Sequence, residues 1–387
     1  MTCCVLAPST DVGALLQTME VTMEGVKILE KKGMMNLIYL RDLRTPGANI
    51  LKQDALSVGA DLAVPRGTIC CETHTVDALL MATDAQLKAL ARKARVQPFG
   101  LKALSSFLHS LDNANKENPS VMGVVNLNAD SFFRGSRCEK DTALARIETM
   151  IAQGARYIDI GGVSSRPGSE AVSEEEEMAR IQPVVDAVYA RKLHEKAVFS
   201  LDSYTPKCLE YALSHGFGLI NDITGLANDA VAKLAGEYGA SVCIMHMQGD
   251  PKTMQHNPYY EDVMGEVDAF FEQRIEKATA FGVEKIILDV GIGFGKTLEH
   301  NLLLLKHQRH FLRFGYPLLV GASRKSLINT LSPSSAEERL GGTLALHLEA
   351  VRNGASIVRC HDVFEHVQAL RVMEALEKTL VQGKHTC

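Results

Sequence analysis

Short apolar runs alternate with longer stretches of helical periodicity along most of the chain. From about residue 120 onward there are eight such runs, each of five to seven residues and rich in Val, Ile and Leu. They are 121–127, 157–162, 198–203, 219–223, 241–247, 285–291, 317–323 and 356–362. Runs of this kind are typical of parallel strands buried on both faces, and eight strand–helix units predict a TIM (β/α)8 barrel.

The N-terminal part predicts a separate, smaller α/β domain. Residues 36–40 and 61–64 have strand character, 49–56 suits a helix, and 83–111 is helix-rich with a break at Pro98-Phe-Gly. Residues 41–49 contain Pro46-Gly47, which favours a solvated turn over an anion-binding loop. We find no catalytic constellation in this part of the sequence.

A polar run from Asp112 to Pro119 has the composition of a linker. We therefore expect two domains, 1–115 and 116–387. The length of 387 residues agrees, because it accommodates a barrel of roughly 250 residues and an added module.

Composition narrows the class of partner. The net charge of -5 argues against nucleic acid or an anionic membrane, and no apolar run approaches the roughly 18 residues of a membrane-spanning helix. Nine cysteines show no C-x-x-C pair or zinc-finger spacing, which favours reduced thiols and a cytoplasmic location. We expect small-molecule substrates.

Polar side chains gather where the predicted strands end. Because the carboxyl ends of barrel strands form one rim, we expect these side chains to meet there. Each would cost a few kcal/mol if buried without a partner, so together they indicate a ligand site. The candidates are Asn126, Asp130, Asp159, Ser165, Arg166, Pro167, Asp202, Asn221, Asp222, Met245, His246, Asp289, Ser323, Lys325, Arg359 and His361.

These residues suggest two sub-sites. The acceptors and amide of Asp202, Asn221 and Asp289, with the cation of Lys325, suit a flat heterocycle with an amidine-like edge. Met245 and Phe294 would line that cavity. The cations Arg359 and His361, near Asn126 and a Ser323-Arg-Lys-Ser turn that opens a helix, suit a phosphate group.

A nucleotide loop is the alternative for the glycines at 291, 293 and 295. They follow a strand, but the G-x-G-x-x-G spacing is absent.

The strand-end motifs resemble those of the dihydropteroate synthase family of folate biosynthesis. The resemblance extends from about Val121 to the end of the chain and does not include the N-terminal domain. The motifs are MGVVNLNADSF from Met122, IDIGGVSSRPG from Ile158, SLDSY from Ser200, INDITG from Ile220, MHMQGDPKTMQ from Met245, LDVGIGFGKT from Leu288, GASRKS from Gly321 and RCHDV from Arg359.

This resemblance implies that the barrel joins (7,8-dihydropterin-6-yl)methyl diphosphate to 4-aminobenzoate with the help of Mg²⁺, releasing pyrophosphate. It also implies a homodimer and inhibition by sulfonamides. By position, pterin-holding groups are Asp202, Asn221, Met245, Asp289, Phe294 and Lys325. Asn126 matches the metal ligand, Arg359 and His361 the diphosphate ligands, and Ser165, Arg166, Pro167 and Ser323 the 4-aminobenzoate side.

The sequence departs from the family pattern mainly in the first loop. Asn128 and Ala129 replace Thr-Pro, and Arg134 stands where an acid is common. Elsewhere Ser165 replaces a threonine and keeps its hydroxyl, and Val290 replaces a proline. The resemblance implies that this loop, 128–137, closes over the diphosphate, and the sequence leaves open whether its departures change metal binding, rate or sulfonamide sensitivity.

Two other functions are compatible with a similar pocket. A pterin-binding methyltransfer domain has no use for a diphosphate site, so Lys325, Arg359 and His361 discriminate against it. A non-enzymatic pterin-binding protein would keep the pocket and lose the cations and the first loop.

Overall fold

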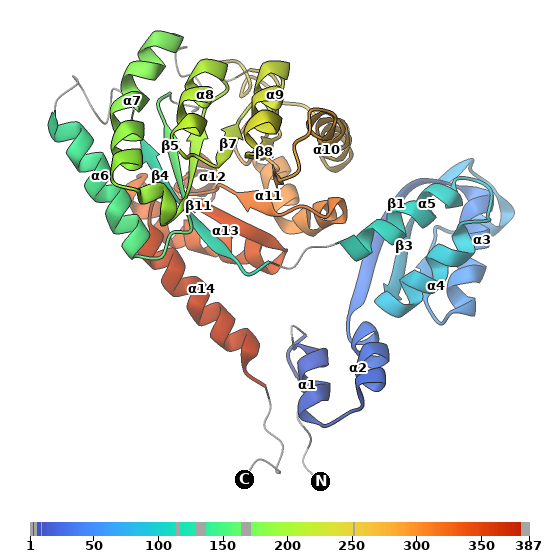
Figure 1. Cartoon of the computed structure of the whole chain (residues 1–387). Coiled ribbons are helices and arrows are strands. Elements are labelled where there is room, and N and C mark those ends of the chain that lie inside the picture. The colour runs from blue at the N-terminus through green and yellow to red at the C-terminus, as the bar shows by residue number, and fades with distance from the viewer. Residues whose placement is uncertain are drawn as a thin grey trace. The chain divides into compact units, whose positions relative to one another are not determined.

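The chain forms two compact units, Met1–Ala114 with Val372–Cys387 and Asn115–Arg371. The computed structural model describes residues 3, 6–8, 10–113, 117–127, 137–163, 172–250 and 252–380, with side chains in the helix that starts at Arg137 described from residue 140. Figure 1 shows the elements of each unit, and each unit is described below by itself.

The second unit is a closed barrel of parallel strands, as predicted. Among its described residues eight strands pair in the order β10-β11-β4-β5-β6-β7-β8-β9. Each strand overlaps one of the eight predicted apolar runs. The strands are β4 Ser120–Asn126, β5 Tyr157–Gly161, β6 Val198–Asp202, β7 Leu219–Asp222, β8 Ser241–Met245, β9 Ile286–Asp289, β10 Leu318–Val320 and β11 Ala355–Cys360.

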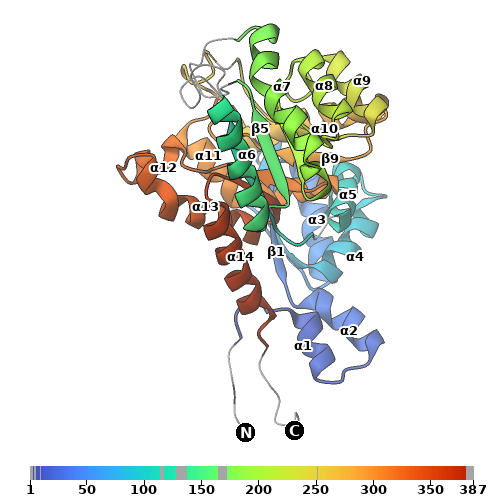
Figure 2. The same cartoon turned by 60° about the vertical axis from the view of Figure 1, so that its left-hand side comes forward.

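Helices surround this barrel (Figure 2). They are α6 Arg137–Ala152, α7 Glu174–Ala190, α8 Pro206–Ser214, α9 Asp229–Tyr238, α10 Val263–Ala280, α11 Leu298–His307, α12 Ser326–Leu331, α13 Leu340–Arg352 and α14 Val363–Lys378, with short 3-10 turns at Leu193–Glu195, Gln308–Phe314 and Glu337–Arg339. Local sequence sets several ends. Ser173 caps α7 by accepting the Glu176 N–H, and Gly239 ends α9 in the left-handed conformation that glycine allows.

The barrel interior is filled by side chains rather than left as a pore. Met122, Leu219, Cys243, Ile287, Leu319 and Ile357 form one buried cluster at its centre. This plug lies earlier along the strands than their polar ends, so it closes the barrel beneath them and leaves the carboxyl ends as the accessible rim.

The first unit is an α/β unit built on a three-stranded antiparallel sheet of order β1-β3-β2. Leu51, Leu80, Leu90 and Leu101 belong to its core. Its elements are α1 Val12–Thr18, α2 Met23–Leu29, a 3-10 turn Glu30–Lys32, β1 Met35–Arg44, α3 Thr45–Ser57, β2 Asp61–Ala63, a 3-10 turn Thr68–Cys70, β3 Thr75–Thr83, α4 Asp84–Ala94, α5 Leu101–Ser110 and a 3-10 turn Leu111–Asn113.

The solvated turn expected over residues 41–49 is wrong. β1 continues to Arg44 and passes directly into α3, where Pro46 occupies the first turn of the helix. Gly47 allows a close approach inside this helix, because a Cβ at that position would lie 3.1 Å from the Phe99 carbonyl oxygen, a tight contact. The Pro-Gly pair therefore serves a helix start and a close contact.

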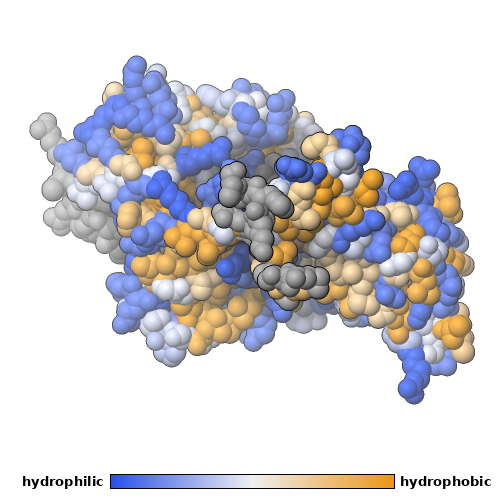
Figure 3. All heavy atoms as spheres, turned by 90° about the horizontal axis from the view of Figure 1, so that it is seen from below, coloured by the Kyte–Doolittle hydropathy of each residue, from blue (hydrophilic) through white to orange (hydrophobic). Residues whose placement is uncertain are grey.

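Apolar side chains reach the surface most often near the start of the chain. Met19, Met23 and Ile28 are more than half exposed, and so is Leu37 on β1. Figure 3 shows one face of the molecule, where hydrophobic and hydrophilic side chains are interspersed. None of the helices in the described residues is long and apolar enough to cross a bilayer.

Candidate active site

Register brings several predicted residues level at the rim of the barrel. Asn126 of β4 pairs with Gly161 of β5, Gly161 with Asp202 of β6, and Asp202 with Asn221 of β7. On the other side of the rim Met245 of β8 pairs with Asp289 of β9. The predicted residues at these strand ends therefore stand at one level, as expected from barrel geometry.

A buried polar cluster joins four strands of this rim, β5, β6, β7 and β11. The Arg359 guanidinium on β11 donates from Nε to Asp159 Oδ2 at 2.6 Å and from Nη2 to Asp202 Oδ2 at 2.9 Å. The Asn221 amide also donates to Asp159 Oδ2, at 3.0 Å. Arg359 thus lies across the barrel mouth between two carboxylates, rather than pointing only to the phosphate side.

Both carboxylates that Arg359 contacts are buried. Asp159 is fully buried and Asp202 is 8% exposed. Burial raises the pKa of the Asp202 carboxyl to about 7, Arg359 opposes that rise, and the negative charge of Asp159 adds to it. Among the described residues the buried Oδ1 of Asp159 has no hydrogen-bond partner. The site therefore holds an acceptor that a ligand donor would satisfy.

Asp289 stands at the end of β9, where the chain turns sharply. Its Oδ1 accepts the N–H of Gly291 at 2.8 Å, and burial raises the pKa of its carboxyl while the Lys325 ammonium opposes the rise. Gly291 has φ of 69°, and a Cβ there would lie 1.9 Å from the His246 carbonyl oxygen. Only glycine permits this turn.

Lys296, at the end of this glycine loop, is a central residue that the sequence analysis did not identify. It is 3% exposed, and its Nζ donates to the carbonyl oxygens of Gly291, Phe294 and His246 at 3.0, 2.9 and 3.2 Å. Its Nζ also lies 3.0 Å from His246 Nδ1. Burial lowers the pKa of Lys296 to about 7 and that of His246 to about 2, so the imidazole is a neutral acceptor. Lys296 ties the loop after β9 to the loop after β8.

Lys325 and Phe294 come together as expected. The Lys325 Nζ lies 4.7 Å from the centroid of the Phe294 ring and donates to the Ile292 carbonyl. Burial lowers the pKa of Lys325 to about 8, with Asp289 opposing the shift. Phe294 packs with Met245 in a small buried cluster that forms an apolar wall of the site.

The loops after β10 and β11 meet at two points. Ser323 Oγ lies 2.9 Å from His361 Nδ1, and Arg324 donates from Nε and Nη2 to the two carboxylate oxygens of Asp362 at 2.9 and 2.6 Å. Burial lowers the pKa of His361 to about 4, and the Arg359 charge adds to that shift. His361 is therefore a neutral donor or acceptor at neutral pH.

The remaining predicted residues differ in what the structure describes. Asn126 is half-buried at the end of β4. Its Oδ1 lies within 3.8 Å of where a Cβ of Gly161 would stand. The residues Asp130, Arg134, Ser165, Arg166 and Pro167 lie outside the described residues. Three or more His, Cys, Asp or Glu side chains do not group into a metal site anywhere in the described ranges.

Asp222 and His246, two of the candidates at the strand ends, have partners within the protein. Asp222 accepts the N–H groups of Thr224 and Leu226 at 2.7 and 3.0 Å, which shapes the loop after β7. His246 accepts from Lys296. These contacts explain why both side chains are polar and buried.

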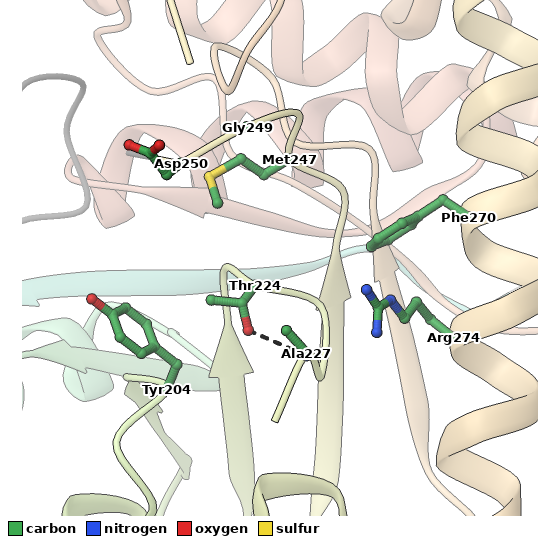
Figure 4. A pocket seen from close by; sticks show the side chains of 8 residues that line it. All are labelled: Tyr204, Thr224, Ala227, Met247, Gly249, Asp250, Phe270 and Arg274. Carbon is green, nitrogen blue, oxygen red and sulfur yellow. Dashed lines mark hydrogen bonds between the residues drawn. The ribbon is translucent and has the colours of Figure 1, made fainter. Parts of the chain in front are cut away.

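A cavity of about 430 Å³ opens among the loops after β6, β7 and β8. Its lining contains none of the predicted site residues: Tyr204, Thr224, Ala227, Met247, Gly249, Asp250, Phe270 and Arg274. Figure 4 shows Phe270 and Arg274 entering from one side and Tyr204 lying on the other. Arg274 donates to the Leu226 carbonyl at 3.4 Å and stacks on Phe270, so it supports the loop after β7.

Comparison with known proteins agrees with this geometry. The family model described as "Pterin binding enzyme" matches residues 122–361. Among curated proteins, the chain is 40% identical to the bifunctional dihydropteroate synthase/dihydropteroate reductase of Helicobacter pylori, over 91% of this chain and 93% of that protein. It is 44% identical to the dihydropteroate synthase of Escherichia coli, over 67% of this chain and 92% of that protein.

Solved structures of the same kind superpose on the barrel. A Yersinia pestis dihydropteroate synthase in a sulfonamide drug complex is 42% identical with a TM-score of 0.64, covering 68% of this chain and 95% of that one. A Thermus thermophilus dihydropteroate synthase in complex with 4-aminobenzoate is 39% identical with a TM-score of 0.61, covering 67% and 95%.

Proposed function

Because this chain belongs to the dihydropteroate synthase family of pterin-binding enzymes, we propose that its barrel condenses (7,8-dihydropterin-6-yl)methyl diphosphate with 4-aminobenzoate to give 7,8-dihydropteroate and pyrophosphate. The structural observation that supports this most is the buried cluster of Asp159, Asp202, Asn221 and Arg359, which combines acceptors for a heterocycle with a cation for a diphosphate. Sulfonamides are expected to compete with 4-aminobenzoate.

The pterin is held by Asp202, Asn221, Asp289 and Lys325, with Met245 and Phe294 against its ring. A carboxylate accepts two parallel N–H bonds from an amidine-like edge, and a buried acceptor without a partner gains most from such a donor. Breaking the carbon–oxygen bond leaves positive charge conjugated with the pterin, so the anionic side chains of this pocket stabilise the transition state.

The leaving group is bound by Arg359 and His361. Arg359 already uses Nε and Nη2 on the two carboxylates, and within the described residues its Nη1 is the donor nitrogen left for a phosphate oxygen. The carboxylates orient the guanidinium before the substrate arrives. Such preorganisation lowers the cost of stabilising charge that develops on the diphosphate.

Asn126 is proposed as the protein ligand of Mg²⁺. An amide oxygen is a hard donor, and magnesium usually keeps several waters and takes its other ligands from substrate phosphates, so a cluster of protein carboxylates is not required. When bound, the metal would neutralise charge on the departing diphosphate. Ser323 is assigned to the 4-aminobenzoate side together with Ser165, Arg166 and Pro167. These groups orient the amine for attack, and no covalent nucleophile from the protein is needed.

Pyrophosphate release tests this function. The purified protein is assayed with both substrates, with and without Mg²⁺, beside Asp202→Ala and Lys325→Ala, with Glu210→Gln on the exposed surface of α8 as control. Turnover that requires Mg²⁺, survives in the control and is lost in both site variants is the expected result. Tight pterin binding without turnover in the wild type would instead indicate a binding protein.

A second activity is suggested by the Helicobacter pylori relative, which is named as a dihydropteroate reductase as well as a synthase. The similarity covers 91% of this chain, so it extends well into the N-terminal unit, which we propose as a domain of its own over residues 1–115. Reduction of dihydropteroate needs a hydride donor. Oxidation of NADH or NADPH that depends on dihydropteroate, measured with the full chain and with a chain starting near residue 116, would detect this activity.

We also expect a homodimer that acts in the cytoplasm. The thiols of Cys70 and Cys71 are exposed and free, which suits a reducing compartment. Light scattering of the purified protein tests the dimer.

A further inference from the structure

Two buried histidines link the two loops that carry Ser323 and His361. His347 lies on α13 and is 1% exposed, and His366 lies on α14 and is 2% exposed. Their rings are in contact, with His347 Nδ1 at 2.8 Å from His366 Nε2. Neither residue belongs to the predicted site.

The outer ends of this histidine pair are bonded to backbone groups. The N–H of Ala322 donates to His347 Nε2 at 3.0 Å, and His366 Nδ1 lies 2.6 Å from the carbonyl oxygen of Asp362. Ala322 immediately precedes Ser323, and Asp362 immediately follows His361. The pair therefore links the same two loops that contact each other directly through Ser323 and His361.

The chemistry of the two end groups fixes the direction of each hydrogen bond that runs from Ala322 through the two histidines to Asp362. A backbone N–H only donates, so His347 Nε2 is the acceptor and the proton of the neutral ring is on Nδ1. That proton is donated to His366 Nε2, so the proton of His366 is also on Nδ1, where it is donated to the Asp362 carbonyl. Protonating either ring would place two donors face to face.

The surroundings keep both rings neutral. Burial lowers the pKa of His347 well below its ordinary value, and the neighbouring His366 and the Lys325 charge add to that shift. Burial also lowers the pKa of His366, which the Asp362 carbonyl and the charges of Asp362 and Glu365 oppose. The donor-to-acceptor direction of the hydrogen bonds through the histidine pair is therefore fixed.

α13 contacts the loop after β10 at a second point on the same face. Thr343 Oγ1, one turn before His347, accepts the N–H of Arg324 at 2.9 Å. Arg324 has φ of 57°, a left-handed conformation that needs support from its surroundings in a residue other than glycine. Two acceptors from one helix thus hold the backbone on either side of Ser323.

We propose that His347 and His366 are positioning residues for the diphosphate and 4-aminobenzoate side of the reaction. They hold the backbone at Ala322 and Asp362 and so set how Ser323 and His361 face the substrates. This inference rests on the roles proposed above for Ser323 and His361. The pterin-holding groups Asp202, Asn221 and Asp289 have no contact with the pair among the hydrogen bonds of the described residues.

The test compares graded substitutions in the full-length protein. His347→Gln keeps an acceptor near the Nε2 position for Ala322, whereas His347→Asn is too short to reach it. His366→Ala removes the other histidine, which bonds the Asp362 carbonyl. His215→Ala is the matched control, because the Nδ1 of His215 also bonds the carbonyl four residues earlier, in Tyr211, at the end of α8 away from the rim.

Each variant is assayed for kcat, for the KM of both substrates and for the Kd of 6-hydroxymethyl-7,8-dihydropterin, which lacks the diphosphate. We expect His347→Asn and His366→Ala to raise both KM values about tenfold, the effect of losing one buried hydrogen bond. His347→Gln is expected to stay within about threefold of the wild type, as is His215→Ala. The Kd of the diphosphate-free pterin should not change in any of them.

Other outcomes overturn the inference. Equal weakening of both pterins, or lower thermal stability with unchanged KM values, would mean that the pair has a general structural role. Imidazole ¹⁵N shifts that place a proton on Nε2 of either ring would refute the hydrogen-bond chain, even if a variant fails to fold. Ser323→Ala and His361→Ala are run alongside. If they raise the KM values and the histidine variants do not, only the positioning role is lost, whereas no effect in any of them also removes the proposed roles of Ser323 and His361.

Discussion

Replacing Asp202 by asparagine should stabilise the unliganded barrel while removing its function. The Asp202 carboxyl is buried against Asp159, and its pKa of about 7 lies about three units above the ordinary value of 3.8. At about 1.4 kcal/mol per unit, the ionised group lowers the free energy of unfolding by about 4 kcal/mol above pH 7, even with Arg359 at 2.9 Å. Asparagine keeps an acceptor for Arg359 without the charge.

The sign of the pH dependence follows from linkage. Between pH 3.8 and 7 the folded state binds the proton that the unfolded state has lost, so this carboxyl makes the protein less stable as the pH rises through that window. The gain in Asp202→Asn is therefore absent at pH 4 and complete above pH 7.

Thermal unfolding of the ligand-free protein measures this effect. At about 2 to 4 °C per kcal/mol, Asp202→Asn should raise the Tm of the barrel by at least about 5 °C at pH 8.5 and leave it unchanged at pH 4. Glu210→Gln, which removes an exposed carboxylate of α8, should leave the Tm within about 1 °C at both values. A Tm for Asp202→Asn that is equal to or below that of the wild type at pH 8.5 would refute the argument that the ionised Asp202 carboxylate destabilises the unliganded protein.

Three further predictions concern the site. Lys296→Met should lower the Tm by several °C and weaken pterin binding, because it leaves the carbonyls of Gly291 and Phe294 without their donor at a cost of about 1 to 3 kcal/mol each; unchanged calorimetric Tm and Kd would contradict this. The affinity for a diphosphate-free pterin should fall by up to about tenfold per pH unit below pH 7, because Asp202 takes up a proton there. This pH dependence should vanish in Asp202→Asn. A Kd from isothermal titration that is constant from pH 5.5 to 8 would exclude Asp202 as the acceptor. Chelation by EDTA should abolish turnover and added Mg²⁺ restore it, with Asn126→Ala needing more metal for half-maximal rate; an identical metal requirement in both proteins would remove Asn126 as a ligand.

The N-terminal unit shows where reading the sequence locally fails. Thr75–Thr83 forms the central strand of its sheet, yet the segment contains Ala, Leu, Leu, Met and Ala, which favour helices, and it was not predicted as a strand. Pairing with β1 and β2 on both sides and burial of Leu80 against the helices override that preference. The Pro-Gly pair at 46–47 failed for a similar reason, because its contact with Phe99 comes from a distant segment.

The barrel, in contrast, could be predicted from the sequence alone. Its eight strands are buried on both faces, so each is a continuous apolar run, and β4, β6, β7 and β9 end on polar residues that solvent or a ligand must satisfy. Asn126, Asp202, Asn221 and Asp289 were found in this way, since position along a strand was enough to place them at the rim.

Only the tertiary structure decided how the side chains at that rim are paired. Arg359 lies between Asp159 and Asp202, Lys296 joins the loops after β8 and β9, and the histidine pair joins those after β10 and β11. Arg359 and Asp159 are 200 residues apart in the chain, so no local pattern relates them. The raised pKa of the Asp202 carboxyl depends on burial, which the closure of the barrel creates and which the order of residues does not contain.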